Sequence, residues 1–143
     1  MNNNLKREII LDNYQNPMNR GLIKDETYIK INTRSSSCVD NIDMMAKVEN
    51  DTIVDIRFDG EACAICTSAT SILIKTLIGK TVKEAKGIIN NYQRMINEEP
   101  YDEEVLEELG VYNETYKQPS RKRCALLPAE SVSKIINITK NDE

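Results

Sequence analysis

The chain of 143 residues contains no histidine. Mechanisms that need an imidazole are therefore excluded, including histidine-based catalytic triads and the usual histidine-rich zinc sites. Any metal ion that this protein binds must be held by thiolates and carboxylates.

Long apolar runs are missing as well. No stretch approaches the roughly 18 apolar residues that a membrane-spanning helix needs. The opening sequence, MNNNLKREIILDNY, has neither the apolar stretch nor the small-residue cleavage site of a signal peptide. We therefore expect no membrane association and a cytoplasmic location.

The sequence also lacks an excess of basic residues. Nineteen Lys and Arg stand against 23 Asp and Glu, which gives a formal net charge of −4. Binding to phosphates needs a basic surface, so nucleic acid is not expected as the main partner. The length fits a single domain over residues 1–143 with enough chain to bury a core.

The order of apolar patterns predicts an α+β fold. Helical spacing covers about residues 4–14, and alternating segments between 27 and 59 predict three antiparallel strands, with a turn at Asn50-Asp51. Helical patterns follow at 63–78 and 81–96, the second opened by a Thr81/Glu84 capping box. The acidic segment 97–114 contains a short helical piece ending at Gly110. A last helix is expected to begin near Cys124, with Pro128 in its first turn.

Four cysteines supply the chemistry. In a reducing cytosol, spaced cysteines are more often metal ligands or catalytic thiols than disulfide partners. Cys38 and Asp40 are two residues apart, so their side chains can address one point in an extended segment. Cys63 and Cys124 are each predicted at a helix N-terminus, where amide hydrogens and the helix dipole favour the thiolate.

Charge counting supports one common site. Three thiolates and one carboxylate around a divalent ion leave about −2, which calls for nearby cations. The only dense basic run, 121–123, adjoins Cys124. Each feature also has a plainer interpretation: Asp40 as a turn residue, and the basic run as solvated surface.

Cys66 is the ambiguous cysteine. Cys63-Ala64-Ile65-Cys66 is formally a Cys-x-x-Cys, but the βαβ surroundings of a thioredoxin-type redox protein are missing. A single cysteine often behaves as a small buried hydrophobe. We expect Cys66 to lie outside the set of metal ligands.

Four segments together carry a family resemblance. They are 7–21, with its Asp-x-Tyr-x-Asn-Pro core; 37–40, Ser-Cys-Val-Asp; 58–63, ending in Gly-x-x-Cys; and 121–127, Arg-Lys-Arg-Cys-Ala-Leu-Leu. In this order and spacing the chain resembles the IscU/SufU family of iron–sulfur cluster assembly proteins, also called NifU N-terminal-like. Arg123 stands where IscU-type members have histidine, and the acidic insertion at 97–114 matches the SufU-type pattern, so the chain resembles SufU more closely.

Three departures from the family pattern are visible, and one is Cys66, which stands where the family usually has a non-ligand residue, often serine. Val39 replaces a usual glycine between the first cysteine and the aspartate, and so loses backbone freedom there. Asn13 replaces a frequent histidine in the opening helix, and we expect only a surface effect.

The resemblance implies a fold with an N-terminal helix, a three-stranded antiparallel sheet and helices packed on one face. It also implies a tetrahedral Zn²⁺ held by Cys38, Asp40, Cys63 and Cys124. Three thiolates equally suit a [2Fe–2S] cluster at Cys38, Cys63 and Cys124, so the sequence leaves zinc and cluster open.

The resemblance further implies sulfur acceptance from a cysteine desulfurase. Cys38 is the expected persulfide acceptor, because it lies on a loop whereas the other two thiols are expected at helix starts, and Arg121 is expected to give electrostatic support. The protein would then be at most a zinc-dependent sulfurtransferase partner. The alternatives are a scaffold that passes a [2Fe–2S] cluster to apo iron–sulfur proteins, and a purely structural zinc domain.

Overall fold

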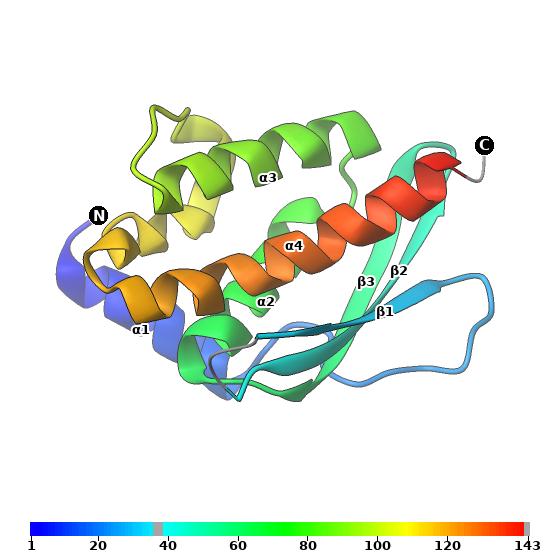
Figure 1. The fold of residues 1–143 in the computed structure, drawn as a ribbon, viewed down its shortest axis with the longest axis horizontal. Helices are drawn as coiled ribbons and strands as arrows, with labels where there is room; N and C mark the ends of the chain where they lie inside the picture. The colour runs from blue at the N-terminus through cyan, green and yellow to red at the C-terminus, as the bar shows by residue number, and fades with distance from the viewer. Residues whose placement is uncertain (36–38, 142–143) are drawn as a thin grey trace.

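The computed structural model describes residues 1–35 and 39–141 of the chain. Four α-helices, three strands and two 3-10 segments follow one another in the described part (Figure 1). Their bounds are α1 Asn3–Gln15, β1 Ile29–Arg34, β2 Asn41–Glu49, β3 Thr52–Glu61, α2 Ala64–Leu77, α3 Val82–Ile96, η1 Glu104–Tyr112, η2 Thr115–Lys117 and α4 Pro119–Asn141.

The three strands form one antiparallel sheet in the order β1-β2-β3. The central strand pairs on both sides, so that Ala46 lies opposite Ile29 on β1 and Ile56 on β3. Asn50 and Asp51 connect β2 to β3 with positive φ values of 51° and 60°. These two residue types tolerate that conformation well, so the predicted two-residue hairpin turn is confirmed.

Helices cover one face of this sheet, with α4 lying across it in Figure 1. Contacts run from α4 to β1 and β2, and from α2 to β3. Helix α2 is also packed by α1, α4 and η1, so most of its residues are buried, including small polar ones. The hydroxyls of Thr70 and Thr76 return hydrogen bonds to helix carbonyls, which allows this polar sequence to lie in the core. The predicted α+β architecture is confirmed.

Helix α4 begins earlier than the sequence predicts. It starts at Pro119, five residues before Cys124, and Pro128 lies inside it. Proline suits the first helical position, because no donor is needed there, so Pro119 can open the helix. Pro128 removes one helical donor, but the residue is buried against the core, where packing outweighs helix propensity. The predicted start near Cys124 and the placement of Pro128 in the first turn are therefore wrong.

Two further expectations need correction. Asn13 is buried rather than on the surface: its side chain donates to the Ile9 carbonyl and accepts from the Ser71 hydroxyl, which itself accepts from the Met18 amide. In the acidic segment, η1 continues past Gly110 to Tyr112 and contains a kink at Glu107.

Candidate metal centre

Three of the predicted ligands converge at one end of the sheet. Asp40, Cys63 and Cys124 each offer a ligand atom, and these atoms all lie within 4.8 Å of one another. They come from the segment before β2, the start of α2 and the second turn of α4. Cys38, the fourth predicted ligand, lies outside the described residues.

The start of α2, where Cys63 lies, orients the side chain of Asp40. Its Oδ1 accepts the backbone N–H of Cys63 at 2.7 Å, and its Oδ2 lies 3.8 Å from Cys63 Sγ. The Asp40 carbonyl accepts from the amide of Ser35 at 2.9 Å, which brings together the chain on both sides of residues 36–39. Although Asp40 is only 1% exposed, its carboxylate is therefore oriented with one oxygen beside the thiol.

Cys63 is the N-cap of α2. Its backbone is extended, with φ −68° and ψ 171°, and its sulfur accepts the backbone N–H of Cys66 at 3.4 Å. A helix N-terminus presents free donors and a partial positive charge, which favours thiolate over thiol. The predicted position of Cys63 at a helix start is confirmed.

Cys124 is placed differently. It is 6% exposed and lies inside α4, and its thiol donates to the carbonyl of Ser120 at 3.7 Å. The dipole effect falls off within the first turn, so it does not act on Cys124 as it does on Cys63. The prediction that Cys124 lies at a helix N-terminus is wrong, although its sulfur reaches the same site.

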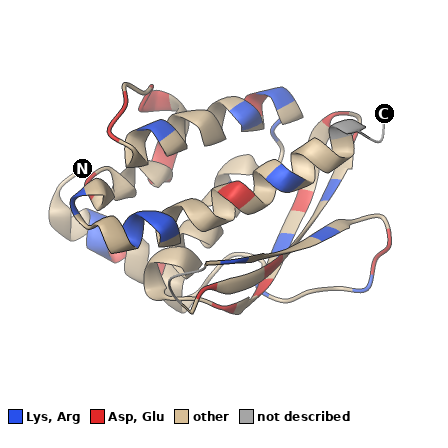
Figure 2. Cartoon of the chain, viewed as in Figure 1, with Lys and Arg blue, Asp and Glu red and all other residues tan. Residues whose placement is uncertain are grey.

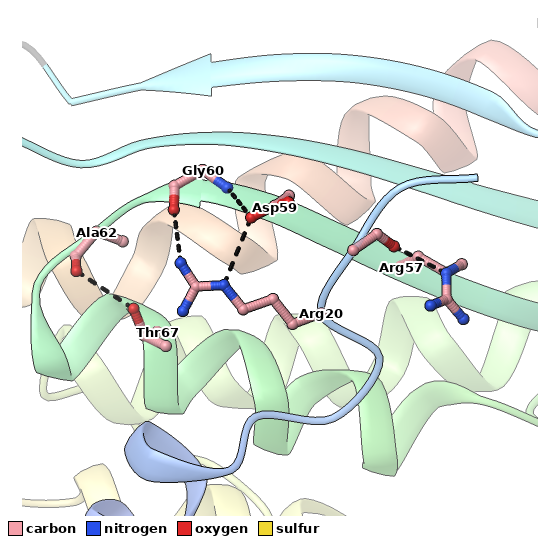
Figure 3. A network of polar contacts seen from close by, with 7 residues as sticks. Arg20, Arg57, Asp59, Gly60, Ala62 and Thr67 are labelled. Carbon is pink, nitrogen blue, oxygen red and sulfur yellow. Dashed lines mark hydrogen bonds and ion pairs between the residues drawn. The ribbon is translucent and has the colours of Figure 1, made fainter. Parts of the chain in front are cut away.

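The chain leading to Cys63 is fixed by a residue that the sequence did not single out. Figure 3 shows Arg20, from the segment after α1, donating to Asp59 Oδ1 at 3.4 Å and to the Gly60 carbonyl at 2.9 Å. Asp59 Oδ1 also accepts the amide of Gly60 at 2.8 Å. The signal for Arg20 was its place in the opening motif 7–21, but only the fold brings that motif beside β3.

Gly60 is required by the same corner. Its φ is +134°, and a Cβ at this position would stand 2.2 Å from the carbonyl oxygen of Asn41. Only glycine fits such a close approach of two backbones without a shift. The end of β3 therefore lies against the start of β2, and this brings Cys63 and Asp40 together.

Basic residues lie on the helix that carries Cys124. Figure 2 shows the run 121–123 on the first turns of α4. Arg121 is one turn before Cys124, and with Lys6 and Arg7 of α1 it lines a groove of about 370 Å³ whose wall also includes Ile65. Since i and i+3 lie on the same helix face, Arg121 and Cys124 share a side of α4.

The donor set suits zinc. Zinc–sulfur bonds of about 2.3 Å and zinc–oxygen bonds of about 2.0–2.2 Å imply tetrahedral ligand separations of roughly 3.5–3.8 Å. The 3.8 Å between Cys63 Sγ and Asp40 Oδ2 already has this spacing, and the whole group lies within 4.8 Å. Two sulfurs and one carboxylate oxygen can thus hold such an ion after a small closure.

Comparison with known families decides the relationship. Residues 5–122 match the family described as the NifU-like N-terminal domain. The chain belongs to this family. The match spans α1, the sheet, α2 and α3, and ends just before Cys124. The inclusion of Cys124 in the candidate site therefore rests on the structure of this NifU-like chain.

Two curated relatives cover most of this NifU-like chain. It is 28% identical over 131 residues to the zinc-dependent sulfurtransferase SufU of Bacillus subtilis, which covers 91% of this chain and 88% of the relative. It is 30% identical over 120 residues to the iron–sulfur cluster assembly scaffold protein IscU of Thermotoga maritima, covering 84% of each. The expected IscU/SufU relationship is confirmed.

A solved structure agrees with the fold. FiSufU from Fervidobacterium islandicum AW-1, described as a SUF-system scaffold for iron–sulfur cluster assembly, superposes with a TM-score of 0.80 at 27% identity. The alignment covers 90% of this chain and 94% of FiSufU. In the described part of this NifU-like chain, no helix combines the length and apolar character needed to cross a membrane.

Proposed function

We propose that this chain accepts persulfide sulfur from a cysteine desulfurase for iron–sulfur cluster assembly. The supporting observation is the convergence of Asp40, Cys63 and Cys124, which come from three separate elements. The likeness to a zinc-dependent sulfurtransferase over 91% of the chain favours this role over a structural zinc domain. Cys63 is also partly exposed, whereas a purely structural site would be closed.

Cys38 completes the proposed ligand set, two residues before Asp40 in the connection between β1 and β2. When bound, zinc would keep these thiols deprotonated and bring no redox chemistry of its own. A cytoplasmic location would suit this site, because a reducing compartment prevents the thiols from forming disulfides.

The transfer itself is thiol exchange. The Cys38 thiolate attacks the outer sulfur of the desulfurase persulfide, a new S–S bond forms on Cys38, and the enzyme's cysteine leaves as a thiolate. Cys63 caps α2 and Cys124 lies inside α4, so we choose as acceptor Cys38, which stands in the sequence between β1 and β2. Arg121 supports the anionic thiolate through its charge.

Replacing Cys38 tests the proposal. Cys38→Ser should keep the fold and gain no persulfide, because a hydroxyl cannot carry sulfane sulfur. It should also fail to stimulate the desulfurase. Mass spectrometry after incubation with desulfurase and cysteine locates the added sulfur; sulfur found only on Cys124 would contradict the choice of acceptor.

The second candidate is a scaffold that assembles a [2Fe–2S] cluster and passes it to apo iron–sulfur proteins. The likeness to the IscU scaffold of Thermotoga maritima and the soft sulfur ligands favour it. Asp40→Ala leaves every thiol in place and, in this alternative, should slow cluster release. A brown protein with cluster absorbance and no persulfide would decide for the scaffold.

A further inference from the structure

Cys66 is a thiol that the proposed function does not use. It is the third residue of α2 and is fully buried, at 0% exposure. Among the described residues, its sulfur is not one of the ligand atoms that converge with Asp40 and Cys124. A buried helix residue could be only a small hydrophobe, so its relation to Cys63 decides whether it has a role.

The two cysteines are joined by the helix cap. Cys63 Sγ lies 3.4 Å from the backbone nitrogen of Cys66, to which it is hydrogen-bonded. The Cys66 sulfur is bonded to Cβ, which in turn is attached to the Cα next to that nitrogen. The N-cap and N3 positions therefore hold the two thiols at opposite ends of a short, pre-formed loop of chain. Disulfides need Cα atoms about 4.4–6.8 Å apart, a distance that residues one helical turn apart satisfy.

Both cysteines act on the buried side chain of Tyr112. Burial raises the pKa of the Tyr112 hydroxyl, a hydrogen bond with Ser68 lowers it, and the nearby Cys66 and Cys63 raise it further. Both thiols thus lie within electrostatic range of one buried hydroxyl. Cys63 is partly exposed while Cys66 is not, so an external reagent meets Cys63 first.

We propose that Cys66 is a resolving thiol that releases hydrosulfide from a persulfide carried on Cys63. This inference rests on the proposed function in one respect, namely that sulfane sulfur reaches the chain. The sulfur can arrive on Cys63 from a donor or by exchange with another thiol of the centre.

The step needs no outside oxidant. Cys66 Sγ attacks the inner sulfur, Sγ of Cys63, and a Cys63–Cys66 disulfide forms. The bond between Cys63 Sγ and its sulfane sulfur breaks, and that sulfur leaves with the electron pair as HS⁻, while the proton of the Cys66 thiol passes to solvent or to the leaving sulfide. The sulfane sulfur is reduced and the two cysteines are oxidised, so the electrons balance. A dithiol reductant would then restore both thiols.

Release of hydrosulfide has a chemical consequence for the centre. Cluster assembly consumes sulfur at the sulfide level, and this step delivers it at the metal ligands. It also converts Cys63 from a thiolate into a disulfide sulfur, which is no longer a ligand of the same kind. The centre would hold its metal less tightly until Cys66 and Cys63 are reduced.

The test uses the full chain, freed of metal by a chelator and loaded with inorganic polysulfide, which needs no desulfurase. After removal of excess donor, hydrosulfide is measured against time and disulfides are mapped by mass spectrometry of non-reduced peptides. We expect about one hydrosulfide for each Cys63–Cys66 disulfide formed. A persulfide on Cys63 that persists, or a disulfide joining Cys63 to another cysteine instead, would overturn the inference.

Two variants distinguish the chemistry of the Cys66 thiol from its role in packing. Cys66→Ala and Cys66→Ser should both retain the Cys63 persulfide and release at least tenfold less hydrosulfide. Ala69→Ser, which adds a hydroxyl at another buried position of α2, should release hydrosulfide as the unmodified chain does. Release that survives in both Cys66 variants would reject the inference. If polysulfide supports release but desulfurase does not, the proposed sulfur acceptance fails while Cys66 keeps its role.

Discussion

Cys63 and Cys124 reach the same centre by different local structures. Cys63 caps α2, is partly exposed, and its sulfur accepts a backbone N–H. Cys124 is buried inside α4, and its sulfur donates to a backbone carbonyl. Cys63 Sγ thus lies between an amide of its own helix and the Asp40 carboxylate, whereas Cys124 Sγ lies against a carbonyl of the preceding turn of α4. Two residues of one type at one site therefore need different physical explanations.

The largest effect on zinc binding is expected when Cys63 is replaced. Cys63→Ser removes a ligand and should lower zinc affinity by about 100-fold or more. Substituting a residue that merely hydrogen-bonds to a metal ligand already lowers metal affinity by about 10–100-fold. With zinc at about 100 times the original Kd, the whole linkage is worth about 2.7 kcal/mol of stability, and most of it should be lost. Metal analysis and thermal unfolding with and without chelator measure both.

The control is the neighbouring thiol. Cys66→Ser should leave zinc content nearly unchanged, because Cys66 is outside the convergent group of described ligands. Full zinc occupancy and an unchanged melting curve in Cys63→Ser would show that the ligand assignment is wrong.

The same two cysteines mark how far the sequence could predict the site. Cys63 was predictable because Gly60 and a following helical pattern define a strand end and a helix start on either side of it. Cys124 was misplaced because Pro128 suggested a nearby helix start, whereas Pro119 provides it. Propensity alone cannot distinguish a proline that opens a helix from one that core packing retains inside it.

Outside the centre, regular apolar patterns were sufficient to predict the sheet, but the positions of isolated polar residues could not be predicted. The alternation of β2 and β3 and the Asn50-Asp51 turn fixed the sheet. The burial of Asn13 depends on Ser71, which is 58 residues away, so no local pattern could reveal it. Arg20 was missed for the same reason, since its partners lie on β3.

A second prediction concerns the corner that brings Cys63 to Asp40. Gly60→Ala forces a Cβ against the Asn41 carbonyl at positive φ, so it should destabilise the protein by about 1–3 kcal/mol. Because the shift moves the end of β3, zinc affinity should fall as well. Gly87→Ala is the control: no heavy atom lies within 4 Å of its new Cβ, and alanine in α3 should stabilise by about 0.5–1 kcal/mol. Equal stability of the two variants would contradict the conclusion that only glycine fits at position 60.

A third prediction compares the two thiols directly. In metal-free protein, iodoacetamide should alkylate Cys63 at least about tenfold faster than Cys124, because Cys63 is partly exposed and accepts an amide hydrogen, whereas Cys124 is buried. Peptide mass spectrometry against time gives the two rates in one sample. Equal rates, or faster labelling of Cys124, would show that the difference in local structure does not govern reactivity.

The smallest effect is expected at Arg121, which acts through charge and not through a bond. Arg121→Glu places an anion on the Cys124 side of α4, so sulfur uptake from the desulfurase should slow by roughly tenfold at low salt. Folding stability should change by no more than about 0.5 kcal/mol, because the side chain is exposed. Lys122→Glu makes the same reversal about 200° around the helix from Cys124, and it should slow uptake much less. The difference between the two variants should shrink at 1 M salt, where the Debye length is about 3 Å. If both variants support uptake equally at low salt, the basic run is ordinary surface, and the buried Cys124 receives no help from its own helix.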